Sequence, residues 1–480
     1  MKVICRVALS LVLFFSLAAV PVAPAEAASS LPAISVKDGR LLDDAGRQVV
    51  LRGVNAGGRS KLPPFYPFEP EPDFQTALTR YADGIASFGF NVVRLIVIYE
   101  AAEPVRGQYD EEYLKKFDAM VEAFAARGIY IIVDSHQDVF SRRFCGDGFP
   151  DWAIREKYRG LPQHEGCRLW NVHYFSTPAL DSFNRLYEND DGLRDSYAAF
   201  FKMLAERYKN EPAVIGFEPM NEPMPGSYGL IHYTKWYEQL FALYEAAGQA
   251  VHAADPRYLI FADLCPLENQ GAWNTRRPRP RVANLVLAPH YYDLGTFSVS
   301  IGKGLEQRAI NTGIARFLEL GRAWNTPVLF SEYGISPLFQ DAPEYINMLY
   351  SAFDAGLVSG TFWEASVSPL TWGWENTSIF EPDGSVRPRA LALDRPYPRA
   401  VAGNIESFSF DPASRRFELT WSESVSASAA TEIYAPPRLY GNMHGVTLDP
   451  PGEWSYDAAR AVLRIAPLMR EGQRRVAIAP

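Results

Sequence analysis

Short apolar runs recur along the chain, and the segments between them have a helical pattern. Eight of these runs are rich in Val, Ile, Leu and Phe and have the length of buried strands. They begin at Val49, Phe90, Ile129, Val214, Tyr258, Leu285, Pro327 and Ser359. Between them, segments such as 110–128 and 233–254 place apolar residues three and four positions apart, as amphipathic helices do. Eight alternations of apolar strand and helix predict an α/β fold, a (β/α)8 TIM barrel.

The pattern changes near residue 396. From about Asn404 to Pro480, apolar and polar residues alternate, as in "RFELTWSE", with Pro and Gly turns and no helical period. This alternation predicts a small β-sandwich at 396–480, joined by a Pro-rich segment to a catalytic domain at 28–395. A carbohydrate- or membrane-binding role is open for this domain, and we favour a packing role that carries no chemistry.

The N-terminus has the pattern of a secretory signal peptide. Lys2 and Arg6 precede an apolar run from Val7 to Val20, and small residues with an Ala-Glu-Ala pattern follow at 25–27. The run is short for a membrane span, and no later segment is apolar enough to cross a bilayer. We therefore expect residues 1–27 to be removed and the mature protein to be secreted.

Composition and cysteine spacing restrict the function classes. The 480 residues are 48% hydrophobic and carry a net charge of −9 without Lys/Arg blocks, which argues against nucleic-acid binding. In an oxidising compartment we expect Cys145 and Cys167, which flank one loop, to form a disulfide and Cys265 to remain free. No cysteine or histidine spacing typical of a metal site accompanies them, so we expect no metal.

Polar and aromatic residues occur where the predicted barrel strands end, which is where active sites of such barrels lie. Each has a plain structural explanation when taken alone, such as an ion pair or a buried histidine. Because all of these residues are predicted to lie on one rim, a separate structural explanation for each is much less convincing than a shared site. These residues are Arg94, His136, Asp138, Asn221, Glu222, His290, Tyr292, Glu332 and Trp363.

Two carboxylates on this rim indicate glycosidic bond hydrolysis. Glu222 ends the fourth strand and Glu332 the seventh, and no cofactor-binding loop is present. That reaction needs one carboxyl as proton donor and a second facing the anomeric carbon, about 5 to 5.5 Å away when configuration is retained. We expect Arg94 to lie close to Glu332 and to keep it ionised.

The motifs "DSHQD", "MNEP", "PHYY", "SEYG" and "FWE", together with Arg94, resemble glycoside hydrolase family 5, over residues 51–364. Within it, "NAGGRSKLPPF", "DSHQDVFS" and the C-terminal sandwich are most similar to the secreted endoglycoceramidases. That resemblance implies a retaining enzyme without a cofactor, acting on the bond between glycan and ceramide of glycosphingolipids. It leaves a transient contact with a membrane surface open, and also the choice between glucosyl and galactosyl linkage.

The resemblance also implies a role for each site residue. Glu222 would be the acid/base and Glu332 the nucleophile, oriented by Tyr292 and supported by Arg94 and His290. The residues that would bind the sugar before the scissile bond are Lys61, His136, Asp138, Asn221 and Trp363. Two alternatives remain, a β-glucanase or β-glucosidase of the same family and a non-catalytic glycolipid-binding protein. The presence of both glutamates argues against the second.

Two further expectations concern residues near this rim. Glu218 lies within the fourth strand, four residues before Glu222, and we expect it to be a buried or paired structural carboxylate. Apolar loops follow the first, sixth and eighth strands at 61–74, 293–302 and 367–380. Their residues, including Phe65, Phe68, Trp372 and Trp374, either form a slot for the lipid or pack as a lid over the barrel.

Overall fold

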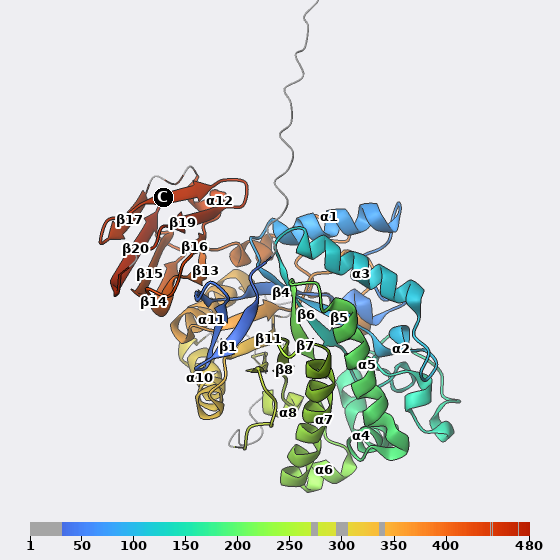
Figure 1. The fold of residues 1–480 in the computed structure, drawn as a ribbon. Coiled ribbons are helices and arrows are strands. Elements are labelled where there is room, and N and C mark those ends of the chain that lie inside the picture. The colour runs from blue at the N-terminus through green and yellow to red at the C-terminus, as the bar shows by residue number, and fades with distance from the viewer. Residues whose placement is uncertain are drawn as a thin grey trace, which may run out of the picture.

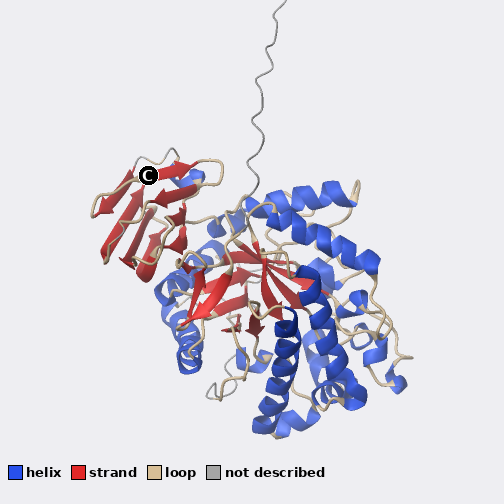
Figure 2. Ribbon diagram, in the orientation of Figure 1, coloured by secondary structure: helices blue, strands red, loops and turns tan. Residues whose placement is uncertain are grey.

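A parallel barrel forms the centre of the molecule, and helices surround it (Figures 1 and 2). The computed structural model describes residues 31–269, 277–293, 306–335, 341–441, 443, 445–468 and 470–480. The segment predicted to be a signal peptide lies outside these ranges. The barrel strands are β4 (Arg52–Ala56), β5 (Val92–Val97), β6 (Tyr130–Ser135), β7 (Val214–Glu218), β8 (Leu259–Ala262), β9 (Leu285–Leu287), β10 (His290–Tyr291), β11 (Leu329–Tyr333) and β12 (Ser359–Phe362).

The barrel closes through its sixth strand, which is interrupted. The hydrogen-bonded order is β10-β11-β12-β4-β5-β6-β7-β8-β9, so β9 and β10 stand at the two ends of the order although they follow each other in the chain. An isolated bridge between Leu287 and Val328 also joins the end of β9 to the residues before β11. The predicted (β/α)8 fold is confirmed, with all eight strands at the predicted positions.

Amphipathic helices cover the barrel because their apolar faces pack on the outward side chains of the strands. The longer ones are α1 (Phe74–Ala86), α3 (Glu111–Ala125), α4 (Thr177–Tyr187), α5 (Leu193–Tyr208), α7 (Tyr233–Ala254), α10 (Gln307–Trp324) and α11 (Ala342–Gly356). The short ones are α2 (Tyr99–Ala102), α6 (Ser227–Ile231) and α8 (Pro266–Asn269). Helix α3 begins where the Asp110 side chain accepts hydrogen bonds from the backbone N–H groups of Glu112 and Tyr113.

The C-terminal region is a β-sandwich beside α11 (Figure 1). Its smaller sheet contains β14 (Gly403–Asp411), β15 (Arg416–Glu423), β20 (Gly472–Ala479) and β17 (Gly445–Asp449). The other sheet contains β13 (Tyr397–Val401), β16 (Thr431–Tyr434), β19 (Val462–Ile465) and β18 (Trp454–Asp457), and α12 (Pro437–Tyr440) follows β16. Phe417 and Trp421 from the first sheet share one core with Ile433 and Leu463 from the second.

The N-terminal strands join this second sheet, which the sequence analysis did not predict. They are β1 (Ile34–Lys37), β2 (Arg40–Asp43) and β3 (Gln48–Val49), and β3 pairs with β13. Ile34 and Leu41 pack with Leu51 and Ile132, which belong to the lower layer of the barrel. A short hairpin cannot bury its apolar face alone, so it is stabilised between the barrel and the sandwich. The two regions are thus joined through a shared sheet, which supports a packing role for the sandwich.

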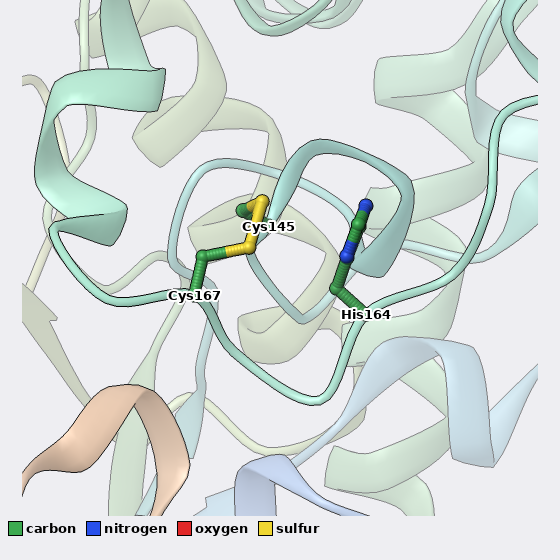
Figure 3. Close-up of side chains that lie close together, drawn as sticks. All are labelled: Cys145, His164 and Cys167. Carbon is green, nitrogen blue, oxygen red and sulfur yellow. A yellow bond between two sulfur atoms is a disulfide. The ribbon is translucent and has the colours of Figure 1, made fainter.

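The cysteine predictions are confirmed. Cys145 and Cys167 form a disulfide across the loop that follows β6, and His164 lies beside it (Figure 3). Cys265 is a free, buried thiol. The disulfide sulfurs are not the thiolates that a metal ion would need at this position. In the part of the chain that the structure describes, no helix is long and apolar enough to cross a membrane.

Candidate active site

The carboxyl ends of the barrel strands surround one cavity of about 250 Å³. This is the place that the topology of the fold reserves for a ligand, because the loops that follow the barrel strands are all on this side of the barrel. Polar, aromatic and apolar side chains line the cavity. They are Lys61, His136, Asp138, Trp170, Asn171, Tyr174, Phe175, Asn221, Glu222, Met224, Pro266, Leu267, Tyr292, Glu332, Trp363 and Glu375.

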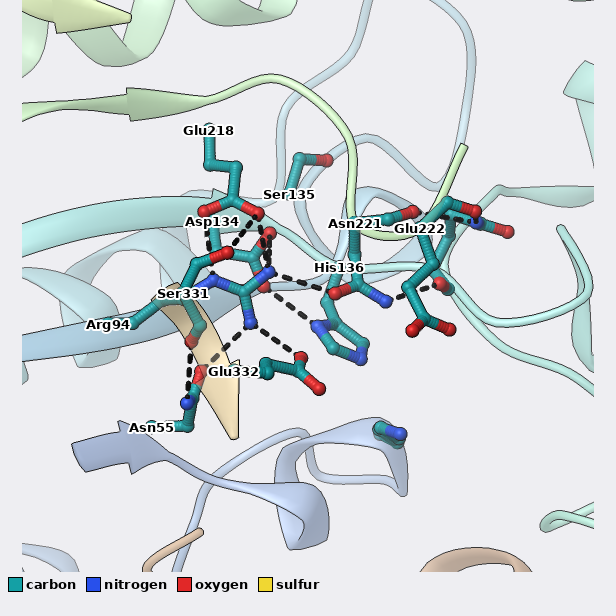
Figure 4. Close-up of polar contacts among 12 residues, drawn as sticks. Asn55, Arg94, Asp134, Ser135, His136, Glu218, Asn221, Glu222, Ser331 and Glu332 are labelled. Carbon is teal, nitrogen blue, oxygen red and sulfur yellow. Dashed lines mark hydrogen bonds and ion pairs between the residues drawn. The ribbon is translucent and has the colours of Figure 1, made fainter. Parts of the chain in front are cut away.

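Arg94, on β5, lies at the centre of a buried polar network below the cavity (Figure 4). Its Nε and Nη2 donate hydrogen bonds of 3.0 and 2.8 Å to the two carboxylate oxygens of Glu218. Its Nη1 donates at 2.8 Å to both Glu332 and Asn55. Glu218 is therefore the buried, paired carboxylate that we expected, and it holds the guanidinium so that Nη1 faces Glu332. The guanidinium thus places a fixed positive charge in direct contact with the Glu332 carboxylate.

Glu332 is held from a second side as well. The hydroxyl of Tyr292 donates a hydrogen bond of 2.7 Å to its Oε2, while Arg94 binds Oε1. Strand register brings His290 close, because His290 on β10 pairs directly with Glu332 on β11. Two donors on two different oxygens define the orientation of the carboxylate, which is what a nucleophile at the cavity surface requires.

Glu222 has a different environment, beyond the end of β7. Its backbone has a φ of 42°, in the left-handed region, and its N–H donates a hydrogen bond of 2.7 Å to Asp263. Gln137 fixes the same turn by donating to the carbonyl oxygens of Asn221 and Glu222. Burial, reinforced by the charge of Asp138 and opposed by Lys61, raises the pKa of Glu222 to about 7. This carboxyl can therefore hold a proton near neutral pH.

His290 lies between the two glutamates. Its Nδ1 is 2.9 Å from Glu222 Oε1 and 3.5 Å from Glu332 Oε2, and its Nε2 is 3.2 Å from Asp263. Burial lowers the pKa of His290 to about 4, so the ring is neutral near pH 7. Because one nitrogen is this close to both carboxylates, Glu222 Oε1 and Glu332 Oε2 lie less than about 6.5 Å apart, the lower end of the range for inverting glycosidases. The spacing suits a retaining mechanism.

A charged cluster with aromatic faces forms another side of the cavity. Lys61 Nζ is 2.6 Å from Asp138 and 4.6 Å from the ring centroid of Trp363, which stacks on His136 at a centroid distance of 5.4 Å. Although burial opposes a charge on His136, Asp134 bonds its Nδ1 at 2.7 Å and raises its pKa to about 10. Both cations offer donors to a ligand that carries hydroxyl groups.

The same cluster contains three groups with the spacing of a cation site. Ligand atoms of His136, Asp138 and Asp147, all buried, lie within 4.8 Å of one another. Lys61 already places a positive charge next to Asp138, so the charge of this cluster is balanced by a side chain. His136 and Asp138 line the cavity together with Trp363, so these polar groups fit a sugar-binding surface.

Eight of the ten predicted site residues line the cavity: Lys61, His136, Asp138, Asn221, Glu222, Tyr292, Glu332 and Trp363. Arg94 and His290 are fully buried and contact the glutamates from behind, as a supporting role requires. Trp170, Tyr174 and Glu375 also line the cavity and Asp263 binds the Glu222 turn, although none of the four was predicted from the sequence. Asp263 directly follows strand β8, so the rule applied to the other strands would have found it.

The structure changes the expected position of the apolar surface. Phe68 is buried and packs against Phe74 and Tyr81, so it faces the barrel wall and not the cavity. Phe65 packs at the edge of Tyr113, and Trp374 is 75% exposed. The loop after the sixth strand lies, from residue 294 on, outside the described residues. The apolar residues that do line the cavity are Phe175, Met224, Pro266 and Leu267.

Three of these residues, Met224, Pro266 and Leu267, belong to segments attached to the turn that carries Glu222. Met224 follows Glu222 by two residues. Pro266 and Leu267 begin helix α8 after a short loop that starts at Asp263, whose carboxylate binds the Glu222 N–H. Cys265 from that loop also contacts the sulfur of Met224 at 3.9 Å. Met224, Pro266 and Leu267 therefore give the cavity an apolar part that is connected to the turn of Glu222, the carboxyl that can hold a proton.

Comparison with known families identifies the chain. The family model described as cellulase (glycosyl hydrolase family 5) matches residues 42–369. The chain belongs to glycoside hydrolase family 5. The model of the glycoside hydrolase family 5 C-terminal domain matches residues 395–478, in agreement with the sandwich. The family resemblance inferred from the sequence motifs is thus confirmed.

Relatives within glycoside hydrolase family 5 cover most of the chain. An endoglycoceramidase of Hydra vulgaris is 28% identical over 447 residues, which are 85% of this chain and 82% of the relative. The structure of endo-glycoceramidase II from Rhodococcus sp. in complex with ganglioside GM3 has a TM-score of 0.77 and 25% identity, covering 92% of this chain and all (100%) of that one. The lactosyl-enzyme intermediate of the same protein has a TM-score of 0.75 and 25% identity, with coverages of 92% and 99%.

Proposed function

We propose that this family 5 enzyme is a retaining glycosidase that cleaves the β-glycosidic bond between the oligosaccharide and ceramide of glycosphingolipids. The observation that carries the proposal is the pair Glu222 and Glu332, bridged by His290, at a cavity whose apolar part is connected to the turn of Glu222. The similarity to endoglycoceramidases over most of the chain supports the same substrate class.

In the first step, the Glu332 carboxylate attacks the anomeric carbon of the sugar that is attached to ceramide. The bond from that carbon to the ceramide oxygen breaks, and Glu222 transfers its proton to the departing oxygen. Ceramide leaves as a neutral alcohol, and the glycan remains bound to Glu332 through an ester. A relative of known structure has been captured as a lactosyl-enzyme intermediate, which supports this step.

In the second step, Glu222 is a carboxylate and acts as the base. It removes a proton from a water molecule, whose oxygen attacks the anomeric carbon from the side that ceramide has left. The ester bond breaks, the glycan leaves with its configuration retained, and Glu332 and Glu222 return to their initial charges. Neutral His290 beside both glutamates adds no charge of its own in either step.

The other cavity residues bind and orient the glycan. Asn221, held by Arg94 at 2.8 Å, faces the 2-hydroxyl of the reacting sugar, and Trp363 provides an apolar face beneath that sugar. His136, Lys61 and Asp138 offer donors and an acceptor to its remaining hydroxyls. On the other side of the scissile bond, Met224 and Leu267 offer an apolar surface to the first methylenes of ceramide, as an enzyme in transient contact with a membrane surface requires.

The apolar surface yields a prediction for Leu267. Because burial of each methylene contributes roughly 0.8 kcal/mol, Leu267→Asn should lower kcat/KM for detergent-dispersed lactosylceramide by about tenfold. Hydrolysis of an aryl β-lactoside should change less than twofold, since a small leaving group does not extend to this surface. Rates on both substrates, with circular dichroism to check the fold, measure the effect.

Leu391→Asn is the matched control, because Leu391 is 43% exposed and lies outside the cavity lining. It should leave both rates unchanged. Equal losses of Leu267→Asn on the two substrates would mean that Leu267 shapes the cavity as a whole and contacts no lipid.

The proposed activity is tested by the products. The purified protein is incubated with lactosylceramide, a ganglioside and a galacto-series glycolipid in detergent, and the products are identified by mass spectrometry. Free ceramide together with the intact oligosaccharide is the expected result. Stepwise loss of single sugars, or activity on soluble β-glucans alone, would favour the glucanase or glucosidase alternative. Binding of glycolipid without any product would favour the non-catalytic alternative.

We further propose that the protein is secreted after removal of residues 1–27. The N-terminal pattern of two basic residues, an apolar run and small residues supports this, and so does the disulfide between Cys145 and Cys167. N-terminal sequencing of protein recovered from the culture medium should begin at Ala28. Retention of an intact N-terminus inside the cell would contradict the proposal.

A further inference from the structure

Asp263 is a fully buried carboxylate to which the proposed mechanism gives no role. It directly follows β8, and its Oδ2 accepts a hydrogen bond of 2.7 Å from the backbone N–H of Glu222. Its Oδ1 accepts one of 2.6 Å from the N–H of Leu264. The third group beside it is the ring of His290, whose Nε2 lies 3.2 Å from Oδ2.

His290 connects Asp263 to the proton donor. Its Nδ1 is 2.9 Å from Glu222 Oε1, so the two ring nitrogens face two different carboxyl groups. Nε2 is buried and forms no aligned hydrogen bond with any described residue, so the Asp263 carboxylate is the acceptor available to a proton on Nε2. Asn269 lies beside both partners, because its Oδ1 accepts from the His290 N–H at 3.2 Å and its Nδ2 is 3.5 Å from Asp263.

A neutral imidazole carries one proton, and the position of that proton decides what Glu222 meets. With the proton on Nε2 of His290, Nδ1 is a bare acceptor for the protonated Glu222 carboxyl. With the proton on Nδ1, the ring donates to Glu222 and stabilises its ionised form. The Asp263 carboxylate favours the first arrangement, because Nε2–H can donate to it, whereas a bare Nε2 would face its negative charge.

The charge of Asp263 is linked to the proton of Glu222. Burial and the charges of Glu218 and Glu222 raise the pKa of Asp263, while the two backbone N–H groups oppose this rise. The Glu222 charge is absent while Glu222 holds its proton, and Glu218 is paired with Arg94 through two hydrogen bonds. Ionised Asp263 and protonated Glu222 therefore favour each other.

We infer that Asp263 is a positioning residue that keeps the proton of His290 on Nε2, so that Glu222 faces a bare nitrogen and retains its own proton for the leaving group. This inference rests on the proposed function, in which Glu222 is first the acid and then the base. In the second step the bare nitrogen offers no donor to the Glu222 carboxylate, which therefore remains a strong base toward water.

NMR of the protein with isotopically labelled histidine nitrogens locates the proton directly. The chain has seven histidines, and His290→Gln identifies the signals of His290. Between the pKa of His290, about 4, and that of Glu222, about 7, the wild type should carry the proton on Nε2. Asp263→Asn should move it toward Nδ1, because an amide at this position can donate to Nε2. A proton on Nδ1 in the wild type would overturn the inference.

The pH profile of kcat/KM shows whether this arrangement acts on Glu222. The substrate is an alkyl β-lactoside, whose leaving group needs a proton. Asp263→Asn should move the alkaline limb down by about one pH unit, because a donor on Nδ1 lowers the pKa of Glu222. In the His290→Gln background, Asp263→Asn should leave the limb where it is, since no ring then connects the two carboxyls. The other charged groups that face His290 or Glu222 stay in every variant; they are Glu332, Arg94, His136, Asp134, Asp138 and Lys61.

Asp255→Asn is the matched control, because Asp255 precedes β8 at its other end and pairs with the exposed Arg257 at 2.6 Å. It should leave the limb unchanged. An unmoved limb in Asp263→Asn, or an equal shift in the His290→Gln background, would show that Asp263 does not act through His290. Cleavage of the alkyl lactoside without release of ceramide from lactosylceramide would instead overturn the proposed substrate and leave the inference about Asp263 in place.

Discussion

Glu332→Gln should lower kcat by on the order of 10⁴-fold or more on every substrate, because an amide cannot form the covalent intermediate. The change adds almost no volume. Arg94 keeps its two hydrogen bonds to Glu218 and its ion pair with Asp134 at 3.1 Å, so the buried guanidinium stays paired. We therefore expect circular dichroism and the melting temperature to remain close to those of the wild type. Initial rates on an aryl lactoside and on lactosylceramide measure the loss.

Chemical rescue separates a missing nucleophile from a damaged site. Glu332→Gly opens space beside Arg94 and Tyr292 that a small anion can enter. With an activated aryl lactoside, azide or formate should restore turnover and give a product of inverted configuration, whereas Glu332→Gln should not respond, because its side chain fills the space. Near wild-type rates for Glu332→Gln, or rescue that yields the retained product, would show that Glu332 is not the nucleophile.

The barrel and most of its rim follow from the sequence because both obey short-range rules. Apolar runs of strand length alternate with helical periods, so the number and order of the elements can be read directly. Once the strands are placed, the residue after each one is placed too, since parallel strands end on the same side. Glu222 and Tyr292, which follow strands, and Glu332, near the end of one, were found in this way. Arg94 lies within β5, and its expected close contact with Glu332 is confirmed at 2.8 Å.

The loops could not be predicted in the same way. Trp170 and Glu375 lie in long connections made of single turns, which have no period and no fixed direction relative to the barrel. For the same reason the sequence could not decide whether the apolar loops form a lipid slot or pack over the barrel, since aromatic content alone does not separate Phe68, buried in the wall, from Phe175 at the cavity. The pairing of the N-terminal strands with β13 was missed because the paired residues, Gln48 and Val401, are about 350 positions apart in the chain.

The environments of the two glutamates explain why they have different roles. Glu332 has a guanidinium at 2.8 Å and a tyrosine hydroxyl at 2.7 Å, both of which stabilise a negative charge. Glu222 contacts a neutral imidazole and is buried near Asp138, and these conditions favour the protonated form. The two environments therefore suit the two different roles proposed for these side chains, an attacking carboxylate and a proton donor.

Glu222→Gln should have an effect that depends on the leaving group. Ceramide leaves as an alkoxide unless it is protonated, so kcat on lactosylceramide should fall by about 10² to 10⁴-fold. An aryl lactoside with an acidic phenol needs no proton, so its first step should persist. Because the second step is then slow, we expect a burst of phenol followed by a low steady rate. Azide should raise this steady rate by attacking the intermediate, and the product should be a glycosyl azide of retained configuration. Losses of equal size in the first step on both substrates would argue against Glu222 as the acid.

The pH profile provides an independent measurement of the same carboxyl. The acid must be protonated to act, so wild-type cleavage of lactosylceramide should be sustained below the Glu222 pKa of about 7 and should fall as pH rises through it. Asp138→Asn removes the neighbouring charge that helps to raise this pKa, so the alkaline limb should move to lower pH. In Glu222→Gln the residual cleavage of lactosylceramide should lack the alkaline limb. If that limb persisted unchanged in Glu222→Gln, another group would control it and Glu222 would not be the proton donor.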